Sequence, residues 1–231
     1  MSLPVSEIFA SFQGEGPRTG RPCTFIRLGG CNLSCSWCDT PYTWDSTRYN
    51  LREELTQRSA EDIFNDLDRD CQEVILTGGE PLMHQGNPEW AVLLRLMSSR
   101  NIYIAVETNG TIAPNEVTQT HVQHYSISPK LENAGKHKRN QDPKLAAWPD
   151  RIVHNKSCLK FVVTDVADVQ QAAEMADRSG WPRWNTWVQP EGITSEAIVK
   201  NFGDIAQAAI QQGINVGTRL HVLAFGNKRG T

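Results

Sequence analysis

The chain has 231 residues, a formal net charge of −3, and a composition that is 39% hydrophobic and 21% charged. This is the composition of an ordinary globular protein that is long enough to bury a substantial core, and we expect residues 1–231 to form a single domain. The slightly acidic balance excludes a strongly basic surface, so we expect no direct contact with a nucleic acid. The sequence contains neither a long apolar run nor a signal peptide, and we therefore predict no membrane partner and a cytoplasmic location.

Short apolar runs rich in β-branched residues recur along the chain, and each ends in a polar or glycine-rich turn. Most of these runs are continuously apolar rather than alternating, which is typical of parallel strands covered on both faces. The predicted strands are residues 23–28, 74–76, 103–106, 124–127, 159–163, 186–188 and 220–223.

Four helices are predicted between these strands. Ser59 and Asp62 resemble a capping box that begins the first helix, and Asn87 followed by Pro88 begins the second. A third helix near 166–178 ends before Gly180, and the longest runs from about 194 to 213. We assign the apolar stripe of this last helix to the core; it comprises Ile198, Val199, Phe202, Ile205, Ala209 and Ile210.

The alternation of strands and helices predicts parallel βα units. A closed eightfold barrel usually needs about 250 residues, and segment 131–155 has no convincing helix, so we predict an incomplete, open (β/α) TIM-like barrel. This segment is rich in Lys, His, Arg, Asn and Pro. We interpret it as a solvated surface loop, with a cover over a site as the alternative.

Three of the six cysteines lie within eight residues, at Cys31, Cys35 and Cys38. Thiolates are the preferred ligands of iron–sulfur clusters, and this spacing allows one loop to ligate three irons of a [4Fe–4S] cluster and leave the fourth open. The alternative is a zinc site with a distant fourth ligand. The other three cysteines lie apart within apolar patterns, and we interpret them as small core residues; they are Cys23, Cys71 and Cys158.

With Trp37 just before the last cysteine, this string resembles the signature of the radical S-adenosylmethionine (SAM) superfamily. The resemblance implies a barrel of the radical SAM type in which the open iron binds SAM and an electron from the cluster releases a 5′-deoxyadenosyl radical. Gly78, Gly79 and Glu80 follow the strand 74–76 and match the superfamily's methionine-amine motif. The glycines would let the backbone approach a ligand, and Glu80 would accept a hydrogen bond from the SAM ammonium group.

Polar groups also follow three further predicted strands, in residues 107–110, 126–130 and 189–192. Because the ends of parallel strands meet at one rim, these groups predict a lined pocket. On the SAM side the resemblance implies contacts from Trp37, Asp39, Gly78, Gly79, Glu80, Ser128, Pro129, Lys130, Gln189, Pro190 and Glu191.

More specific elements flank the cysteines, namely the QGEG string at 13–16, the CDT string at 38–40 and the terminal segment 220–230. With them the chain is similar, over nearly its whole length, to the 7-carboxy-7-deazaguanine synthase family. That resemblance implies a lyase that converts 6-carboxy-5,6,7,8-tetrahydropterin to 7-carboxy-7-deazaguanine and ammonia by radical ring contraction. SAM is regenerated, and the product enters 7-deazapurine pathways such as queuosine biosynthesis, a tRNA modification.

The resemblance also implies residues for the pterin. Arg27 is expected to pair with its carboxylate, with a surface ion pair as the alternative. Glu107 is the expected catalytic residue, as an acceptor of a hydrogen bond or a proton, and His221 is either a contact or a core histidine. Thr40 is expected to bind Mg²⁺ unless it is a plain turn cap. The remaining expected contacts are Phe12, Gln13, Gly14, Glu15 and Thr77.

The implied partners are a reducing electron donor, such as flavodoxin or ferredoxin, and a second copy of the chain in a homodimer. Two other functions compete with this interpretation. One is a radical activase that acts on a partner protein, and the other is a zinc-stabilised binding module.

Overall fold

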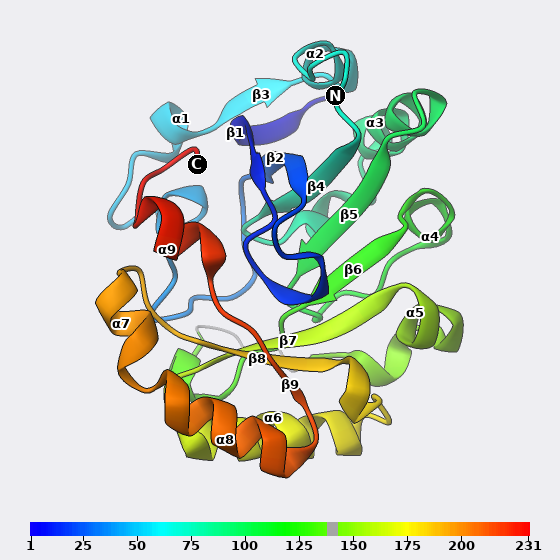
Figure 1. Ribbon diagram of the computed structural model, residues 1–231. Coiled ribbons are helices and arrows are strands. Elements are labelled where there is room, and N and C mark those ends of the chain that lie inside the picture. Colours follow the sequence, from blue (N-terminus) through cyan, green and yellow to red (C-terminus); the bar gives the residue numbers. More distant parts are fainter. Residues whose placement is uncertain (138–142) are drawn as a thin grey trace.

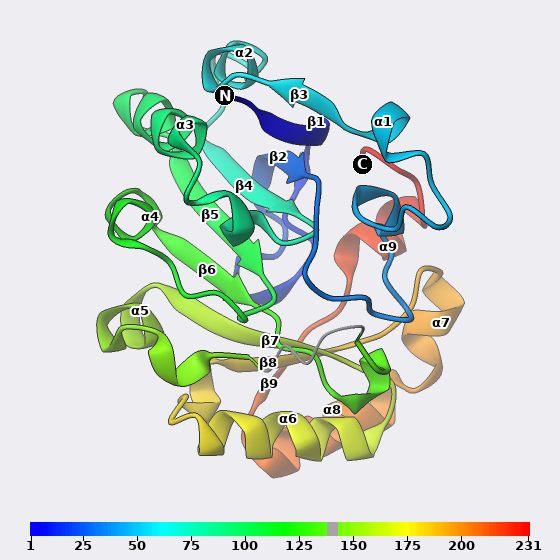
Figure 2. The same cartoon turned by 180° about the vertical axis from the view of Figure 1, so that it is seen from behind.

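The computed structural model describes residues 1–137 and 143–231. In these residues one curved, nine-stranded sheet has the order β3-β1-β2-β4-β5-β6-β7-β8-β9. The sheet bends into a partial barrel that stays open between β3 and β9 (Figures 1 and 2). No helix in the described part of the chain is long and apolar enough to cross a membrane.

Neighbouring strands are parallel from β2 to β9, whereas β1 pairs antiparallel with both β2 and β3. Strand β1 was not predicted, because its buried positions are interrupted by polar residues. The strands are β1 (Leu3–Phe12), β2 (Pro22–Leu28), β3 (Thr56–Arg58), β4 (Glu73–Gly78), β5 (Tyr103–Thr108), β6 (His124–Ile127), β7 (Ser157–Val163), β8 (Thr186–Pro190) and β9 (Asn215–Val216).

Most helices cover the convex side of the sheet, whereas the last helix lies beside the opening of the barrel (Figures 1 and 2). The predicted caps are present, since Ser59 accepts a hydrogen bond from the Asp62 amide and Asn87 accepts one from the Glu89 amide. The helices are α1 (Leu51–Glu54), α2 (Ala60–Asn65), α3 (Pro88–Ser99), α4 (Glu116–His121), α5 (Asp150–Asn155), α6 (Val166–Arg178), α7 (Ser195–Lys200), α8 (Phe202–Gln212) and α9 (Leu220–Phe225).

The two faces of the sheet differ in chemistry. In β7, Leu159, Phe161 and Val163 belong to the main apolar core that packs against the helices. Because side chains alternate along a strand, the intervening Lys160 and Val162 face the concave side, where both line a cavity. Strand β7 therefore turns an apolar face to the helices and brings a charged side chain to the cavity on its concave face.

Two predicted elements differ from the structure. Residues 220–223 form part of helix α9 rather than a strand, because a short apolar run is compatible with either element and β9 already occupies this edge of the sheet. The helix predicted over 194–213 is divided at Asn201 into α7 and α8. Within its apolar stripe, Val199 is 59% exposed and Ile210 is 73% exposed, so these two residues are not part of the core.

Segment 131–155 is more ordered than a solvated loop. It contains the short helix α5 and buries Leu131, Ala134, Leu145 and Trp148 against the rest of the molecule. These apolar side chains are spaced too irregularly to indicate a helix, which explains the incorrect prediction. Residues 138–142 of this segment lie outside the described residues.

Candidate active site

A cavity of about 220 Å³ lies on the concave side, at the carboxyl ends of the parallel strands. It is bounded by the loop after β2, the ends of β4 and β5, the β1–β2 connection and the start of α9. The expected site residues that line it are Phe12, Gln13, Gly14, Glu15, Arg27, Cys31, Cys35, Trp37, Cys38, Asp39, Thr40, Thr77, Gly78, Gly79, Glu107, Ser128, Lys130 and His221.

The loop of residues 30–40, which we call the cluster loop, brings all three closely spaced cysteines to this cavity. Nitrogen donors approach two of the sulfurs: the Leu33 amide is 3.4 Å from Cys31 Sγ, and Trp44 Nε1 is 3.4 Å from Cys38 Sγ. Such donors stabilise thiolates bound to iron. Burial raises the pKa of Cys31 to about 12 in the metal-free chain, so metal binding must displace a proton from this thiol.

Both glycines of the GGEP string line the cavity, and both also have a packing role. A Cβ at Gly78 would lie 2.0 Å from the Leu28 carbonyl oxygen, and a Cβ at Gly79 would lie 2.0 Å from the carbonyl oxygen of Gly30. Both glycines therefore let this turn pack directly against the backbone that carries the cluster loop. The turn and the loop are further joined by a 2.8 Å hydrogen bond from the Glu80 amide to Gly30.

The carboxylate of Glu80 does not line the cavity and is completely buried. It accepts hydrogen bonds from the Leu82 amide (3.0 Å), the Thr108 hydroxyl (2.8 Å) and the Asn109 amide (2.7 Å). Burial raises the pKa of Glu80 to about 7, against the lowering effect of these donors. Its side chain thus joins the ends of β4 and β5 instead of facing a ligand.

The other residues expected on the SAM side fall into two groups. Lys130 Nζ donates to Ser128 Oγ at 3.0 Å and lies 5.2 Å from the centre of the Trp37 ring, and all three residues line the cavity. The four remaining residues do not line it; they are Pro129, in the connection after β6, and Gln189, Pro190 and Glu191, at the end of β8.

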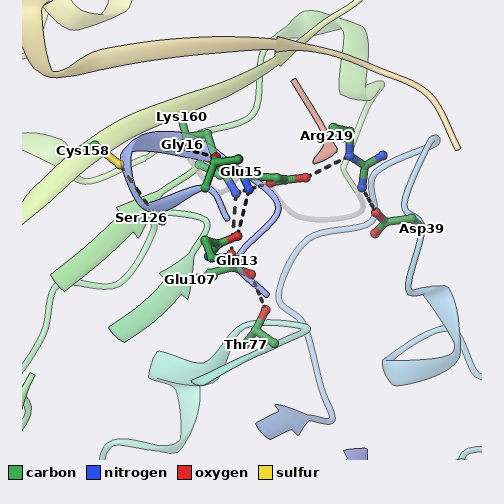
Figure 3. A network of polar contacts seen from close by, with 12 residues as sticks. Gln13, Glu15, Gly16, Asp39, Thr77, Glu107, Ser126, Cys158, Lys160 and Arg219 are labelled. Atoms are coloured by element: carbon green, nitrogen blue, oxygen red, sulfur yellow. Dashed lines mark hydrogen bonds and ion pairs between the residues drawn. The ribbon is translucent and has the colours of Figure 1, made fainter. Parts of the chain in front are cut away.

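Glu107 lies at the centre of a polar network on the concave face (Figure 3). Gln13 Nε2 donates to its Oε1 at 3.0 Å, and the Thr77 hydroxyl donates to its Oε2 at 2.8 Å. The register of the parallel strands explains the second contact, because these residues end the adjacent strands β4 and β5. Three residues expected to contact the same ligand are therefore bonded to one another.

Glu15 forms the second part of this network. Its carboxylate makes a close ion pair with Lys160 Nζ and accepts a 2.9 Å hydrogen bond from Arg219 Nε. Burial alone would raise the pKa of Glu15, but the charges of Lys160 and Arg219 hold it well below its ordinary value. We call Glu15, Glu107, Lys160 and Arg219 the charged wall of the cavity.

Arg219 connects three segments that are distant in the sequence. In addition to Glu15, its guanidinium pairs with Asp39 of the cluster loop and donates to the Gly192 carbonyl at 2.7 Å. The side chain of Asp39 is therefore engaged in an ion pair. Burial would raise the pKa of Asp39, but the charge of Arg219 lowers it.

Arg27 is also paired, with its Nε 2.8 Å from Glu7 Oε2. Glu7 accepts a further hydrogen bond from the Tyr42 hydroxyl at 3.1 Å and contacts Arg229. The two terminal nitrogens of Arg27 have no hydrogen-bond partner within the described part of the chain, and the residue lines the cavity. A ligand in the cavity can therefore accept hydrogen bonds from the two terminal nitrogens of Arg27.

Two smaller expectations concern Gly14 and Thr40. A Cβ at Gly14 would lie 2.0 Å from His221 Nδ1, so this glycine makes room for the histidine as well as for a ligand. Thr40 begins a short 3-10 turn, but its hydroxyl makes no capping hydrogen bond and lies 3.8 Å from Cys38 Sγ. The hydroxyl is therefore not used as a cap.

Sequence analysis missed Lys160 and Arg219. Lys160 did carry a signal, since it is a cation in the middle of the apolar run 159–163. Buried lysines of this kind need a partner, which marks them as candidates for a site. Arg219 precedes a segment that was assigned to a strand and carried no comparable signal.

Comparison with known proteins agrees with this geometry. A model of the radical SAM superfamily matches residues 25–128. A 7-carboxy-7-deazaguanine synthase from Pyrobaculum aerophilum is 36% identical over 98% of this chain and 96% of its own length. One from Bacillus cereus is 29% identical over 99% of this chain and 98% of its own length.

Solved structures agree with the fold. The crystal structure of QueE from Escherichia coli superposes with a TM-score of 0.69 and 26% identity, over 96% of this chain and 95% of that one. SuiB from Streptococcus suis, solved with bound S-adenosylmethionine, has a TM-score of 0.54 over 81% of this chain and 48% of its own, but its 15% identity supports the fold alone. The predicted open barrel of the radical SAM type is confirmed, and the chain belongs to the 7-carboxy-7-deazaguanine synthase family of radical SAM enzymes.

Proposed function

We propose that this enzyme converts 6-carboxy-5,6,7,8-tetrahydropterin to 7-carboxy-7-deazaguanine and ammonia, as a carbon–nitrogen lyase of 7-deazapurine (queuosine) biosynthesis. The observation that carries the proposal is that a single cavity is lined by the three closely spaced cysteines, by Arg27 and by the carboxylates of Glu15 and Glu107. The names of the relatives that match the chain over nearly its full length support the same reaction.

A radical SAM enzyme uses a [4Fe–4S] cluster and SAM. We assign the cluster to Cys31, Cys35 and Cys38, and the donor set fits because the three thiols line one cavity and two of them, Cys31 and Cys38, receive nitrogen donors. When bound, the cluster and SAM supply the adenosyl radical that abstracts hydrogen from C6 of the pterin. The cavity residues assigned to SAM are Trp37, Asp39, Gly78, Gly79, Ser128 and Lys130.

The opposite side of the cavity suits the pterin. The terminal nitrogens of Arg27 are available for the substrate carboxylate, while Glu7 fixes the guanidinium through its Nε. Glu107 and Glu15 present carboxylate oxygens that accept hydrogen bonds from ring and amino N–H groups. The other proposed contacts are Phe12, Gln13, Gly14, Thr77 and His221, and all of them line the cavity.

A magnesium ion beside Thr40 forms a further part of the proposal. The Thr40 hydroxyl faces the cavity and is not used as a turn cap. Mg²⁺ keeps several waters and needs few protein ligands, so one hydroxyl together with substrate oxygens is a suitable site.

We also propose that residues 1–231 act as one domain, that a flavodoxin- or ferredoxin-like protein supplies the electron, and that the enzyme is a homodimer. A single apolar core that includes residues from Leu3 to Ile214 supports the first of these statements. The other two rest on the requirement for a reductant and on the family resemblance.

The decisive experiment is anaerobic turnover of the carboxytetrahydropterin with reconstituted protein, SAM, a reductant and magnesium. We expect the deazaguanine product and ammonia in equal amounts, with no net consumption of SAM. The Cys35→Ala variant provides the blank. Intact SAM cleavage without the product would overturn the specific reaction and favour the alternative, an activase that acts on a partner protein.

A further inference from the structure

Lys160 occupies an unusual position in the sheet. It is the fourth residue of the seven-residue strand β7, it is only 5% exposed, and its neighbours Leu159 and Phe161 are completely buried. A buried ammonium group is costly unless anionic groups surround it. The residues that face Lys160 should therefore explain why it is there.

Two carboxylates from different elements face Lys160 (Figure 3). Its Nζ forms a close ion pair with Glu15 of the β1–β2 connection and lies 3.8 Å from Oε1 of Glu107 at the end of β5. Burial alone would lower the pKa of Lys160, but these two carboxylates raise it above the ordinary value. Lys160 is therefore charged throughout the physiological pH range.

The other contacts of Glu15 and Glu107 do not link the two carboxylates to each other. Arg219 holds the second oxygen of Glu15 and also binds Asp39, and within the part of the chain that the structure describes it forms no ion pair with Glu107. Within the described ranges, the other partners of Glu107 are the neutral side chains of Gln13 and Thr77. Among the described residues, Lys160 is the cation that pairs with both carboxylates.

We propose that Lys160 is a positioning residue for the substrate, whose ammonium group holds Glu15 and Glu107 side by side so that both accept hydrogen bonds from N–H groups along one edge of the pterin. The proposal rests on the proposed function and adds a residue and a specificity to it. A ligand with adjacent N–H donors, such as a 2-amino-4-oxo-pteridine ring, satisfies two neighbouring carboxylates. A ligand with acceptors at that edge places them against the carboxylate oxygens and donates no hydrogen bond, which costs binding energy.

The charged surroundings determine how a variant behaves. Lys160 and its two carboxylates are surrounded by titratable and charged groups from several elements. Besides Glu15 and Glu107 themselves, these groups are His124, Cys158, Arg219, His221 and, through Arg219, Asp39. Without Lys160, Glu15 keeps Arg219 as a partner, so its carboxylate remains partly compensated. Glu107 loses its cationic neighbour and keeps only neutral donors.

The first test replaces Lys160 by Met, which keeps most of the volume and removes the charge. We expect the KM for the pterin to rise about tenfold or more, and the KM for SAM to change by less than about twofold, because one charged contact is lost on the pterin side alone. Lys156→Met is the matched control, since Lys156 lies just before β7, donates to two backbone carbonyls and does not line the cavity. The control should leave both KM values unchanged.

Two readouts distinguish positioning from a merely structural role. In Lys160→Met, the loss of the cation raises the pKa of the Glu15 carboxyl group, so kcat/KM for the pterin should fall on the acid side at a higher pH than in the wild type. In Lys160→Ala, added methylammonium or ethylammonium should restore part of the pterin affinity. Neither amine should affect Lys156→Met.

The outcomes are separable. Equal increases in both KM values, an unchanged pH profile or no rescue by either amine would overturn the positioning role. If the wild type makes no deazaguanine product, the proposed function fails on its own. The ion pair between Lys160 and Glu15 can then still be tested by measuring the unfolding free energy of wild type and Lys160→Met at acid pH. If this free energy depends on pH in the same way in both proteins, the ion pair is overturned. A variant that fails to fold is replaced by Lys160→Gln, for which the same results are expected.

Discussion

Two buried carboxylates, one on each side of the cavity, are stabilised in different ways. Glu80, beside the cluster loop, accepts three hydrogen bonds from neutral donors, and burial raises its pKa to about 7. Glu15, in the charged wall, has two cations as partners, and its pKa is held well below the ordinary value. The first carboxyl can therefore become neutral near physiological pH, whereas the second remains charged.

The difference reflects how the two regions are assembled. Glu80 belongs to a turn that packs directly against the cluster loop, and its partners lie within the neighbouring strand ends. The charged wall brings together residue 15, strands β5 and β7, and the segment before α9. Neutral hydrogen bonds and close backbone packing thus hold the turn beside the cluster loop, whereas ion pairs hold the charged wall, and the following variants test this contrast.

The largest effect is expected on the cluster side. Cys35→Ala removes one of three thiolate ligands, and we expect complete loss of the cluster and of activity. Iron content and the absorption band of the reconstituted protein measure the loss. Cys71→Ala is the matched control, because this cysteine is part of the core and does not line the cavity. A full complement of iron in Cys35→Ala would contradict the ligand assignment.

In the charged wall, Arg219→Met leaves Asp39 and Glu15 without one of their cations. Breaking a buried ion pair from one side is expected to destabilise the fold by about 3 kcal/mol, measured by urea unfolding. Arg183→Met removes a pair with Asp177 on the surface and should change the unfolding free energy much less. Equal costs for the two variants would remove the distinction between the charged wall and an ordinary surface pair.

Glu80 should make stability depend on pH in a direction opposite to that of Glu15. The pKa of Glu80 is higher in the folded protein than in the unfolded chain, so between these two pKa values the folded state binds a proton that the unfolded state has lost. Raising the pH from about 4.5 to about 7 therefore lowers the unfolding free energy. The unfolding free energy of wild type relative to Glu80→Gln should fall by about 2 kcal/mol between pH 5 and pH 7. A difference that is constant over this range would show that Glu80 is already ionised at pH 5.

The smallest effect concerns the substrate side alone. Arg27→Ala should raise the KM for the pterin about tenfold, which corresponds to about 1.4 kcal/mol, and change the KM for SAM much less. Arg18→Ala is the control, because Arg18 pairs with Glu73 at the beginning of β4 and does not line the cavity. Equal losses for both ligands in Arg27→Ala would contradict the carboxylate role.

The sequence by itself determined the features that are local. Cys31, Cys35 and Cys38 all lie within one loop. The helix caps at Ser59 and Asn87 involve residues at most three positions away. Six of the seven predicted strands are present, because continuous apolar runs reflect burial on both faces. The seventh run, at 220–223, was too short to distinguish a strand from the helix that forms there.

Only the tertiary structure decided which residues meet across the cavity. Lys160 was visible as a cation in an apolar strand, but its partner Glu15 lies 145 positions away, and Arg219 lies 204 positions from the same carboxylate. The tertiary structure also placed Gly78 and Gly79 against the backbone that carries the cluster loop, and it placed the Glu80 carboxylate outside the cavity. The physical reason is the same in each case, because an ion pair or a close backbone contact depends on distances that arise only when the sheet has curved and closed around the cavity.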